Sequence, residues 1–148
     1  MLGRTANEPK LIFPGLADFY AAVSHLWYPM IRVVFAGCLM THGWAKLMGG
    51  AAAIAPGMAK SGFVPGLAFA YAAIVLETVG AACVGLGLFT RFFAAAIAIE
   101  MGLITFVVQL PRGFARMELA LLFGVVFFAI ALRGGGPYSL DRVIGKEL

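Results

Sequence analysis

The chain has 148 residues, of which 62% are hydrophobic and only 12% are charged, and its mean hydropathy is +0.96. Such a chain carries too little polar surface to cover a water-soluble globule, so the composition excludes a soluble domain and predicts an integral membrane protein. The formal net charge of +4 does not indicate nucleic-acid binding, because the eleven Lys and Arg residues are scattered and mostly flank apolar segments.

The first 28 residues combine a polar start with an aromatic-rich segment. Residues 1–10 are polar, and Pro14, Asp18 and His25 interrupt the apolar segment that follows. This pattern is unlike a cleavable signal peptide, so we expect the segment to be retained. Aromatic side chains favour the level of the lipid headgroups, so residues 11–28 fit a short interfacial helix, and a simple extension of the first span fits equally well.

Four segments are long and apolar enough to cross a bilayer as helices. An apolar core of roughly 30 Å requires about 20 helical residues, and the sequence predicts spans over residues 29–47, 67–89, 92–110 and 116–132. We therefore predict an all-α fold, an integral membrane four-helix bundle that forms a single membrane domain. Its tail would run over residues 133–148, after a Gly-rich end to the last helix.

The connections between the spans indicate how the helices are paired. Only Thr90 and Arg91 separate the second span from the third, which predicts a tight antiparallel hairpin. The link over residues 49–66 is too rich in Gly and Pro to be one helix, so we expect a short helix in its Ala-rich middle, on the surface or dipping into the bilayer. The side that holds both termini carries six Lys and Arg residues against four on the other, which favours cytoplasmic termini.

Six ionisable side chains fall within these spans. A charge at membrane depth costs at least about 2.5 kcal/mol on insertion scales, so such residues are kept where they pair or have a function. Helical spacing places Glu77 on a face of small residues that should point into the bundle, and His42 and Lys46 on one face of the first span. The full set is Arg32, His42, Lys46, Glu77, Glu100 and Glu118.

Depth along the spans suggests partners for these residues. We expect Arg32 to pair with Glu77 or Glu100, and Lys46 or His42 to pair with Glu118. Two interpretations remain open: the pairs only fix the order and register of the helices, or they line a functional pocket. No spacing of Cys and His indicates a metal site, a mid-span disulfide between Cys38 and Cys83 is not expected, and His25 and His42 are too far apart along a helix to share a haem.

The order of these residues resembles the DoxX-like family of small bacterial four-helix membrane proteins. The resemblance rests on Arg32, on a His-Gly-x-x-Lys element at residues 42–46, on Glu77, and on a Gly-Leu-Phe-Thr-Arg turn at residues 87–91. It extends through Gly113-Phe114 and Glu118 to a closing segment at residues 136–141. Glu100 stands outside this pattern, and Gln109 occupies a region where many relatives carry a His.

The resemblance implies a multi-pass protein of the bacterial inner membrane that acts with redox enzymes. The family is named after the membrane subunits of a thiosulfate:quinone oxidoreductase, so the resemblance implies a membrane subunit of a redox complex that binds a quinone headgroup or relays its protons. We take His42, Lys46 and Glu118 as the candidate catalytic group and Arg32, Glu77 and Glu100 as the candidate cofactor-binding group. The isoprenoid tail would lie among Phe35, Phe69, Phe106 and Phe123.

Other functions remain compatible with the sequence. No flavin, haem, iron–sulfur, nicotinamide or metal motif is present, so any oxidoreductase activity would require other protein subunits as partners. A non-catalytic accessory or assembly subunit of a larger respiratory or photosynthetic complex fits the same four helices. A proton or solute pathway also fits, although four helices would have to oligomerise to enclose a wide pore. A quinone site predicts a lipid-accessible cleft that reaches His42 or Lys46, whereas an accessory role predicts a dry and fully paired interior.

Overall fold

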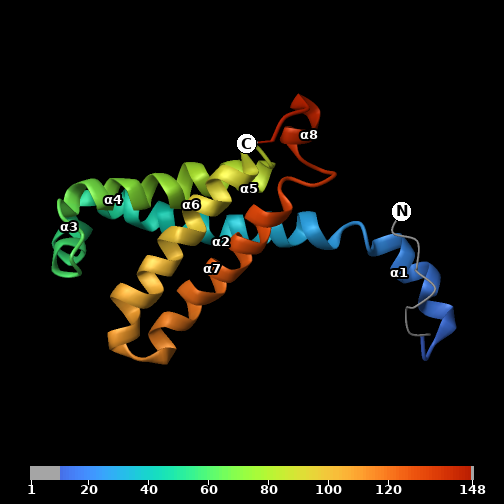
Figure 1. Cartoon of the computed structure of the whole chain (residues 1–148), viewed down its shortest axis with the longest axis horizontal. Helices are drawn as coiled ribbons and strands as arrows, with labels where there is room; N and C mark the ends of the chain where they lie inside the picture. The colour runs from blue at the N-terminus through green and yellow to red at the C-terminus, as the bar shows by residue number, and fades with distance from the viewer. Residues whose placement is uncertain (1–10, 148) are drawn as a thin grey trace.

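The computed structural model describes residues 11–147, and every regular element in this part of the chain is helical (Figure 1). The N-terminal part consists of a short 3₁₀ turn, Pro14–Leu16, and of α1 (Ala17–Val23), α2 (Trp27–Gly49) and α3 (Ala51–Lys60). The central part consists of α4 (Gly66–Val75), a π-helical segment, Leu76–Gly80, and α5 (Ala81–Leu86), which form one continuous helix. The remaining elements are α6 (Thr90–Leu103), a second π-helical segment, Ile104–Gln109, a 3₁₀ turn, Leu110–Arg112, α7 (Phe114–Arg133) and α8 (Leu140–Ile144).

The predicted all-α membrane fold is confirmed. Among the described residues, three helices are long and apolar enough to cross a membrane, namely Gly66–Leu86, Thr90–Arg112 and Phe114–Arg133. A fourth span results if α2 is counted together with the segment Pro14–Val23, from which it is bent by 53°. At most of their ends, the expected spans agree with these helices to within a few residues. The bend shows that the N-terminal segment is not a straight extension of α2, and its place at the membrane interface stays a prediction.

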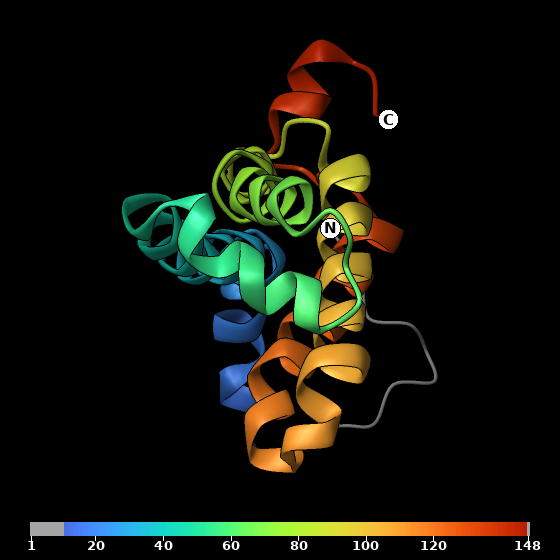
Figure 2. The same cartoon turned by 90° about the vertical axis from the view of Figure 1, so that its left-hand side faces the viewer.

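The long helices form two antiparallel pairs that cross each other (Figures 1 and 2). The α4–α5 helix runs along α2, and α6 packs along α7 as a hairpin. α6 also contacts the π-helical segment of the first pair, whereas α7 meets α2 only locally. Large apolar side chains fill the crossing, and the most deeply buried of them are Leu39, Val84, Ile97, Phe127 and Ile130.

Gly43 allows α2 to approach the π-helical segment closely. A Cβ atom at this position would lie only 2.6 Å from the Glu77 carbonyl carbon and 2.7 Å from its oxygen, both of which are backbone atoms. Small residues permit such contacts between helix backbones in membranes. This contact holds α2 against Glu77 one helical turn before Lys46, and it gives a physical reason for the glycine of the His-Gly-x-x-Lys element.

The link after α2 contains the expected short helix. α3 packs against α4 through Ala51, Ala70 and Ile74, which form a small apolar cluster of their own. Gly66 makes this packing possible, because a Cβ atom there would lie 2.3 Å from the Ala55 carbonyl oxygen. The helix itself is confirmed, while its depth in a bilayer stays a prediction.

The turn between α5 and α6 differs from the predicted one. α5 ends at Gly87, whose φ of 74° suits glycine, and the turn occupies residues 87–89, so that Thr90 already belongs to α6. The Asp141 carboxylate caps this helix from the tail, since it accepts hydrogen bonds from the backbone N–H groups of Phe89 (2.7 Å) and Thr90 (3.0 Å) and from the Thr90 hydroxyl (2.6 Å). Carboxylates are favoured at helix N-termini, where backbone donors lack intrahelical partners.

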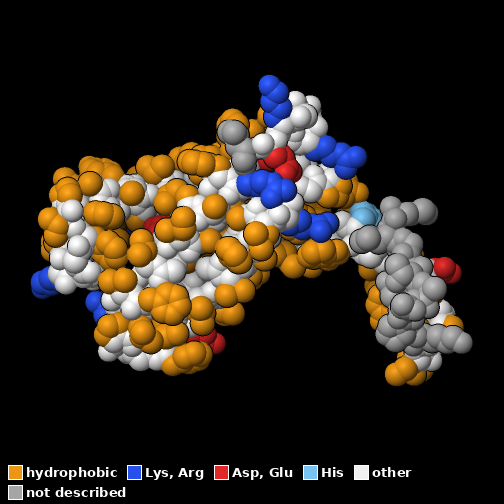
Figure 3. Space-filling model, in the orientation of Figure 1, with side chains coloured by type: hydrophobic (Ala, Val, Ile, Leu, Met, Phe, Trp, Pro, Cys, Tyr) orange, Lys and Arg blue, Asp and Glu red, His pale blue; other side chains and the backbone are white. Residues whose placement is uncertain are grey.

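The tail is also attached to the end of α7. The Arg91 guanidinium donates hydrogen bonds to the carbonyl oxygens of Leu132 (2.8 Å) and Ala131 (3.2 Å), and it pairs with Glu147 (2.8 Å). The exposed face in Figure 3 is mostly apolar, and Lys and Arg side chains gather around α8. A membrane protein of this kind exposes its apolar side chains to lipid and keeps its cations near the headgroups.

Candidate functional site

A buried ion pair joins the two helices of the first pair. The Lys46 ammonium, near the end of α2, donates to Oε1 of Glu77 in the π-helical segment. The Glu77 side chain is 2% exposed and that of Lys46 is 28% exposed, so the carboxylate lies inside the protein and the ammonium reaches its edge. The prediction that Glu77 points into the bundle is confirmed. π-helical segments of this kind occur frequently at functional sites.

The ion pair lines a polar cavity of about 160 Å³. Its wall is made by α2, the π-helical segment with Glu77, the end of the α6 helix, and the first half of α7. Apolar residues such as Leu39, Met101 and Ala120 supply the remaining wall. Five polar or ionisable side chains converge on this cavity, namely His42, Lys46, Glu77, Gln109 and Arg116.

Two buried hydrogen-bond acceptors in this cavity lack a protein partner. Oε2 of Glu77 and Oε1 of Gln109 are fully buried and accept no hydrogen bond from the residues that the structure describes. A buried polar atom without a partner costs free energy, and most such atoms in proteins are satisfied. Two acceptors without a protein partner therefore lie close to the donor groups of His42, Lys46 and Arg116.

An apolar groove continues from the polar cavity between α2 and α7. This groove has a volume of about 700 Å³ and shares His42, Leu119 and Phe123 with the cavity. The His42 ring contacts the Phe123 ring edge-on, with centroids 6.0 Å apart, where the two spaces meet. The outer groove is lined by side chains that are about half exposed, Val33, Val34 and Leu122, so it opens toward the lipid.

The structure pairs the six ionisable residues differently from the prediction. Lys46 binds Glu77 rather than Glu118, so the expected Lys46–Glu118 and Arg32–Glu77 pairs are wrong. Glu118 is exposed and does not line the cavity. The reason is its position on α7: it lies two residues, or about 200°, from Arg116, which faces the cavity.

Arg32 belongs to the attachment of the tail. Its guanidinium donates to the carbonyl oxygens of Gly135 and Tyr138, the latter at 2.5 Å, and its side chain is buried. The neighbouring Tyr28 hydroxyl donates to the Gly134 carbonyl oxygen. Arg32 thus lies away from the polar cavity and satisfies backbone carbonyls that follow the end of α7.

Glu100 lies in a different cavity, so the expected Arg32–Glu100 pair is also wrong. Its two carboxyl oxygens are buried, accept no hydrogen bond from the described part of the chain, and face a separate apolar space between α4 and α6. The aromatic residues expected around a quinone tail are likewise divided. Phe35 and Phe123 line the groove between α2 and α7, whereas Phe69 and Phe106 line other surface hollows.

Sequence reasoning missed two polar residues of the cavity. From the sequence, Arg116 is only one of the four Lys and Arg residues on the side opposite the termini, and Gln109 is only a departure from relatives that carry a His. Arg116, Leu119, Ala120 and Phe123 recur at helical spacing and share one face of α7, which is the signal that could have placed the exposed Arg116 side chain beside the cavity. Gln109 ends the second π-helical segment, and the extra residue of a π turn changes which side chains face inward.

No group of three or more His, Cys, Asp or Glu side chains that could hold a metal ion occurs among residues 11–147. Cys38 and Cys83 are free thiols.

Comparison with known proteins now gives the family. The family model described as DoxX matches residues 28–110, which is more than half of the chain. The chain belongs to the DoxX family. No curated protein and no solved structure matches it significantly. The region that matches the DoxX model includes His42, Lys46, Glu77 and Gln109, while Arg116 and Phe123 of the cavity lie beyond it.

Proposed function

We propose that this DoxX-family protein is the membrane subunit of a redox complex and binds a quinone headgroup in the polar cavity. The observation that supports this most directly is the junction at His42, where a cavity with unpartnered acceptors opens into a lipid-facing apolar groove. Buried acceptors without a partner among residues 11–147 favour this role over that of an accessory subunit, for which we expect a fully paired interior. The groove and the cavity together suit a molecule with a polar ring and a long apolar tail.

The side chains of the cavity match both redox states of a quinone headgroup. A quinone carries two carbonyl oxygens, which accept hydrogen bonds from groups such as the Lys46 ammonium, the Arg116 guanidinium or the His42 ring. The quinol form carries two hydroxyl groups, which donate to acceptors such as Oε2 of Glu77 or Oε1 of Gln109. Reduction takes up two electrons and two protons, and His42 and the Lys46–Glu77 pair are groups able to transfer those protons.

The groove between α2 and α7 would hold the isoprenoid tail. Most of the side chains that line it are apolar. Phe35 and Phe123 contact each other edge-on along the groove, with ring centroids 5.8 Å apart. Entry from the lipid requires no opening through the protein, because the lining residues Val33 and Leu122 are exposed. Burial of the apolar tail would add favourable free energy without specific polar contacts.

The electrons would come from another protein. The chain carries no flavin, haem or iron–sulfur motif, so a partner subunit with such a redox group would donate them. The bacterial inner membrane, where quinones and their reductases occur, is the location that this role implies.

Photolabelling tests the proposed site. We expect a short-tailed azidoquinone, irradiated with the purified full-length protein in nanodiscs, to label α2 around residues 33–46 and α7 around residues 119–123, and decylubiquinone to prevent the labelling. Loss of a charge-assisted hydrogen bond costs about 1.5–3 kcal/mol, so Lys46→Met should lower labelling at subsaturating quinone about tenfold or more. Lys60→Met removes an exposed Lys outside the cavity and is the matched control, with labelling like the wild type.

Two results would contradict the proposal. Labelling that decylubiquinone does not prevent, or that spreads over all lipid-facing helices, would mean that no specific site exists. Equal labelling of Lys46→Met and the wild type would mean that the polar cavity does not bind the quinone headgroup. Either result would favour the accessory-subunit role. Gentle purification and identification of the proteins that remain bound would then test that role.

A further inference from the structure

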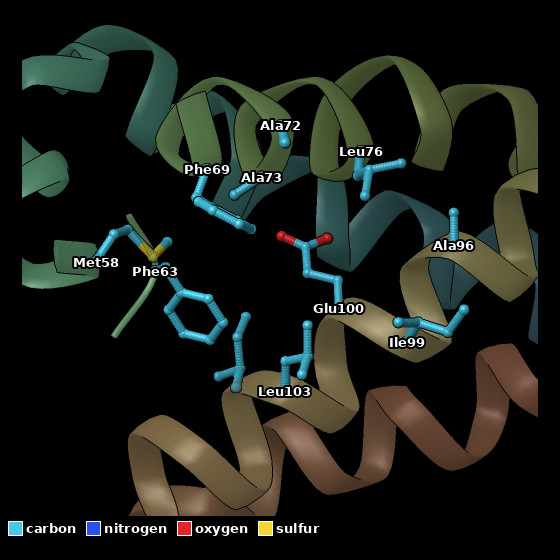
Figure 4. Close-up of a pocket in the computed structure, with 11 residues that line it drawn as sticks. Met58, Phe63, Phe69, Ala72, Ala73, Leu76, Ala96, Ile99, Glu100 and Leu103 are labelled. Carbon is cyan, nitrogen blue, oxygen red and sulfur yellow. The ribbon is translucent and has the colours of Figure 1, made fainter. Parts of the chain in front are cut away.

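A second cavity lies between α4 and α6, apart from the proposed quinone site. It has a volume of about 200 Å³ and is lined almost entirely by apolar side chains from α3, α4, α6 and the link before α4. Its one ionisable group is the Glu100 carboxyl, which points from α6 toward Ala73 on α4 (Figure 4). Neither the polar cavity nor the groove at His42 includes Glu100 among its lining residues.

The Glu100 carboxyl has no polar neighbour to satisfy it. Both of its oxygens are buried and neither accepts a hydrogen bond within the part of the chain that the structure describes. Two charged groups act on this carboxyl from nearby, the Glu77 carboxylate and the Lys46 ammonium, and these are bound to each other. A carboxyl group in an apolar setting without a partner is costly, and membrane proteins retain such a group mainly where it takes part in binding or transport.

Aromatic rings lie beside this carboxyl in the same cavity. Phe63 and Phe69 contact each other with ring centroids 5.3 Å apart at an interplanar angle of 49°, and the thioether of Met58 lies next to them. Aromatic faces attract organic cations, most strongly where water is excluded. A carboxylate and an aromatic pair together form a recognition set for positive charge on an apolar molecule.

The cavity opens toward the lipid and has the size of a ring. Phe69, Ile99 and Leu103, which line it, are 41%, 66% and 42% exposed on the apolar surface. An apolar cavity of about 150 Å³ is known to hold a benzene molecule, so this space accommodates one aromatic ring or a quaternary ammonium group. Longer parts of a ligand would extend into the bilayer.

We propose that the Glu100 cavity is a second binding site, which takes a lipophilic organic cation from the membrane. Glu100 forms the ion pair with the ligand, and Phe63 and Phe69 contact its cationic group. This site differs from the quinone site in its charged residue, its aromatic residues and its opening, and the two cavities share only Ile104 among their lining residues.

Equilibrium dialysis with radiolabelled benzyltrimethylammonium tests this site. The full-length protein is placed in nanodiscs of zwitterionic lipid at pH 8, and empty nanodiscs measure the partition of the cation into lipid. We expect saturable binding that Glu100→Gln weakens at least about tenfold, because the variant keeps the shape of the side chain but removes its charge. Phe63→Leu should weaken it about threefold, through loss of one cation–π contact.

Controls separate this site from other effects. Asp18→Asn removes an exposed carboxylate of α1 and should bind the cation like the wild type. His42→Ala should also bind it like the wild type, so failure of the quinone proposal and failure of this one are distinguishable. The absence of saturable binding above empty nanodiscs, or equal binding by Glu100→Gln and the wild type, would overturn the proposal.

Discussion

The Lys46–Glu77 pair shows how this protein keeps charges inside a membrane. An isolated carboxylate or ammonium in hydrocarbon is strongly unfavourable, and pairing with hydrogen bonds reduces the cost. The pair forms at a place where the helix backbones are in contact, so neither side chain has to cross a gap. One carboxylate oxygen remains unpartnered, which makes the pair suited to binding as well as to holding α2 in place.

Gly43 should be the most sensitive position of α2. Gly43→Ala places a methyl group 2.6 Å from the Glu77 carbonyl carbon, well inside van der Waals contact, so the helices must separate. Overpacking of this kind costs about 1–3 kcal/mol, and we expect that loss in the free energy of unfolding, measured by SDS titration in mixed micelles. Gly37→Ala is the matched control, because a Cβ atom at Gly37 would meet no atom within 4 Å. Equal stability of the two variants would show that the close contact is unimportant.

At the scale of the elements, the tail and the turn between α5 and α6 connect the ends of α5, α6 and α7 through hydrogen bonds. Gly87, Thr90 and Arg91 belong to one motif, and each contacts the tail or the end of α7. A Cβ atom at Gly87 would lie 2.5 Å from that of Ser139, and the Asp141 N–H donates to the Gly87 carbonyl oxygen at 2.8 Å. The motif residues at 87–91 and those at 136–141 are therefore partners in one structure, and their role is to fix the ends of α5, α6 and α7.

Asp141 should carry much of this attachment. Asp141→Ala removes three hydrogen bonds from the start of α6, and loss of an N-cap side chain typically costs about 0.5–2 kcal/mol. We expect a lower thermal midpoint and faster proteolytic cleavage of the tail in detergent. Arg142→Ala, at an exposed neighbouring side chain, should leave both unchanged. Tail cleavage at the same rate in both variants would contradict this role.

The sequence predicts some of these elements well and others poorly, for identifiable reasons. Hydropathy placed the long helices, because burial in lipid requires about 20 apolar residues wherever a span occurs. It could not place Asp141 against Phe89, since 52 residues separate them and no periodicity connects them. Depth along the spans also predicted the wrong charge pairs, because depth does not say which neighbouring helix a side chain faces. In addition, the π turn at Glu77 changes the direction in which the side chains after it point.

At the scale of the whole molecule, the crossing of the two helix pairs creates the hollows between the helices. α6 and α7 pack along each other and cross the first pair, so α7 touches α2 only over a short stretch. The rest of that interface stays open as the apolar groove. A bundle of four parallel-packed helices would close this groove, so the crossing itself leaves an apolar path from the lipid-facing surface to the polar cavity.

Filling the groove should therefore block the quinone without disturbing the polar residues. Gly37 lines the groove, and a Cβ atom there would meet no atom within 4 Å, so we expect the ring of Gly37→Phe to occupy the groove. We expect azidoquinone labelling of α2 and α7 to fall several-fold, while the Lys46–Glu77 pair and the SDS unfolding transition remain. Gly102→Phe is the matched control: Gly102 is also free of atoms within 4 Å, but it lines the hollow between α6 and α7. Equal labelling in the two variants would mean that the tail does not enter between α2 and α7, whereas a selective loss in Gly37→Phe would identify this groove as its path.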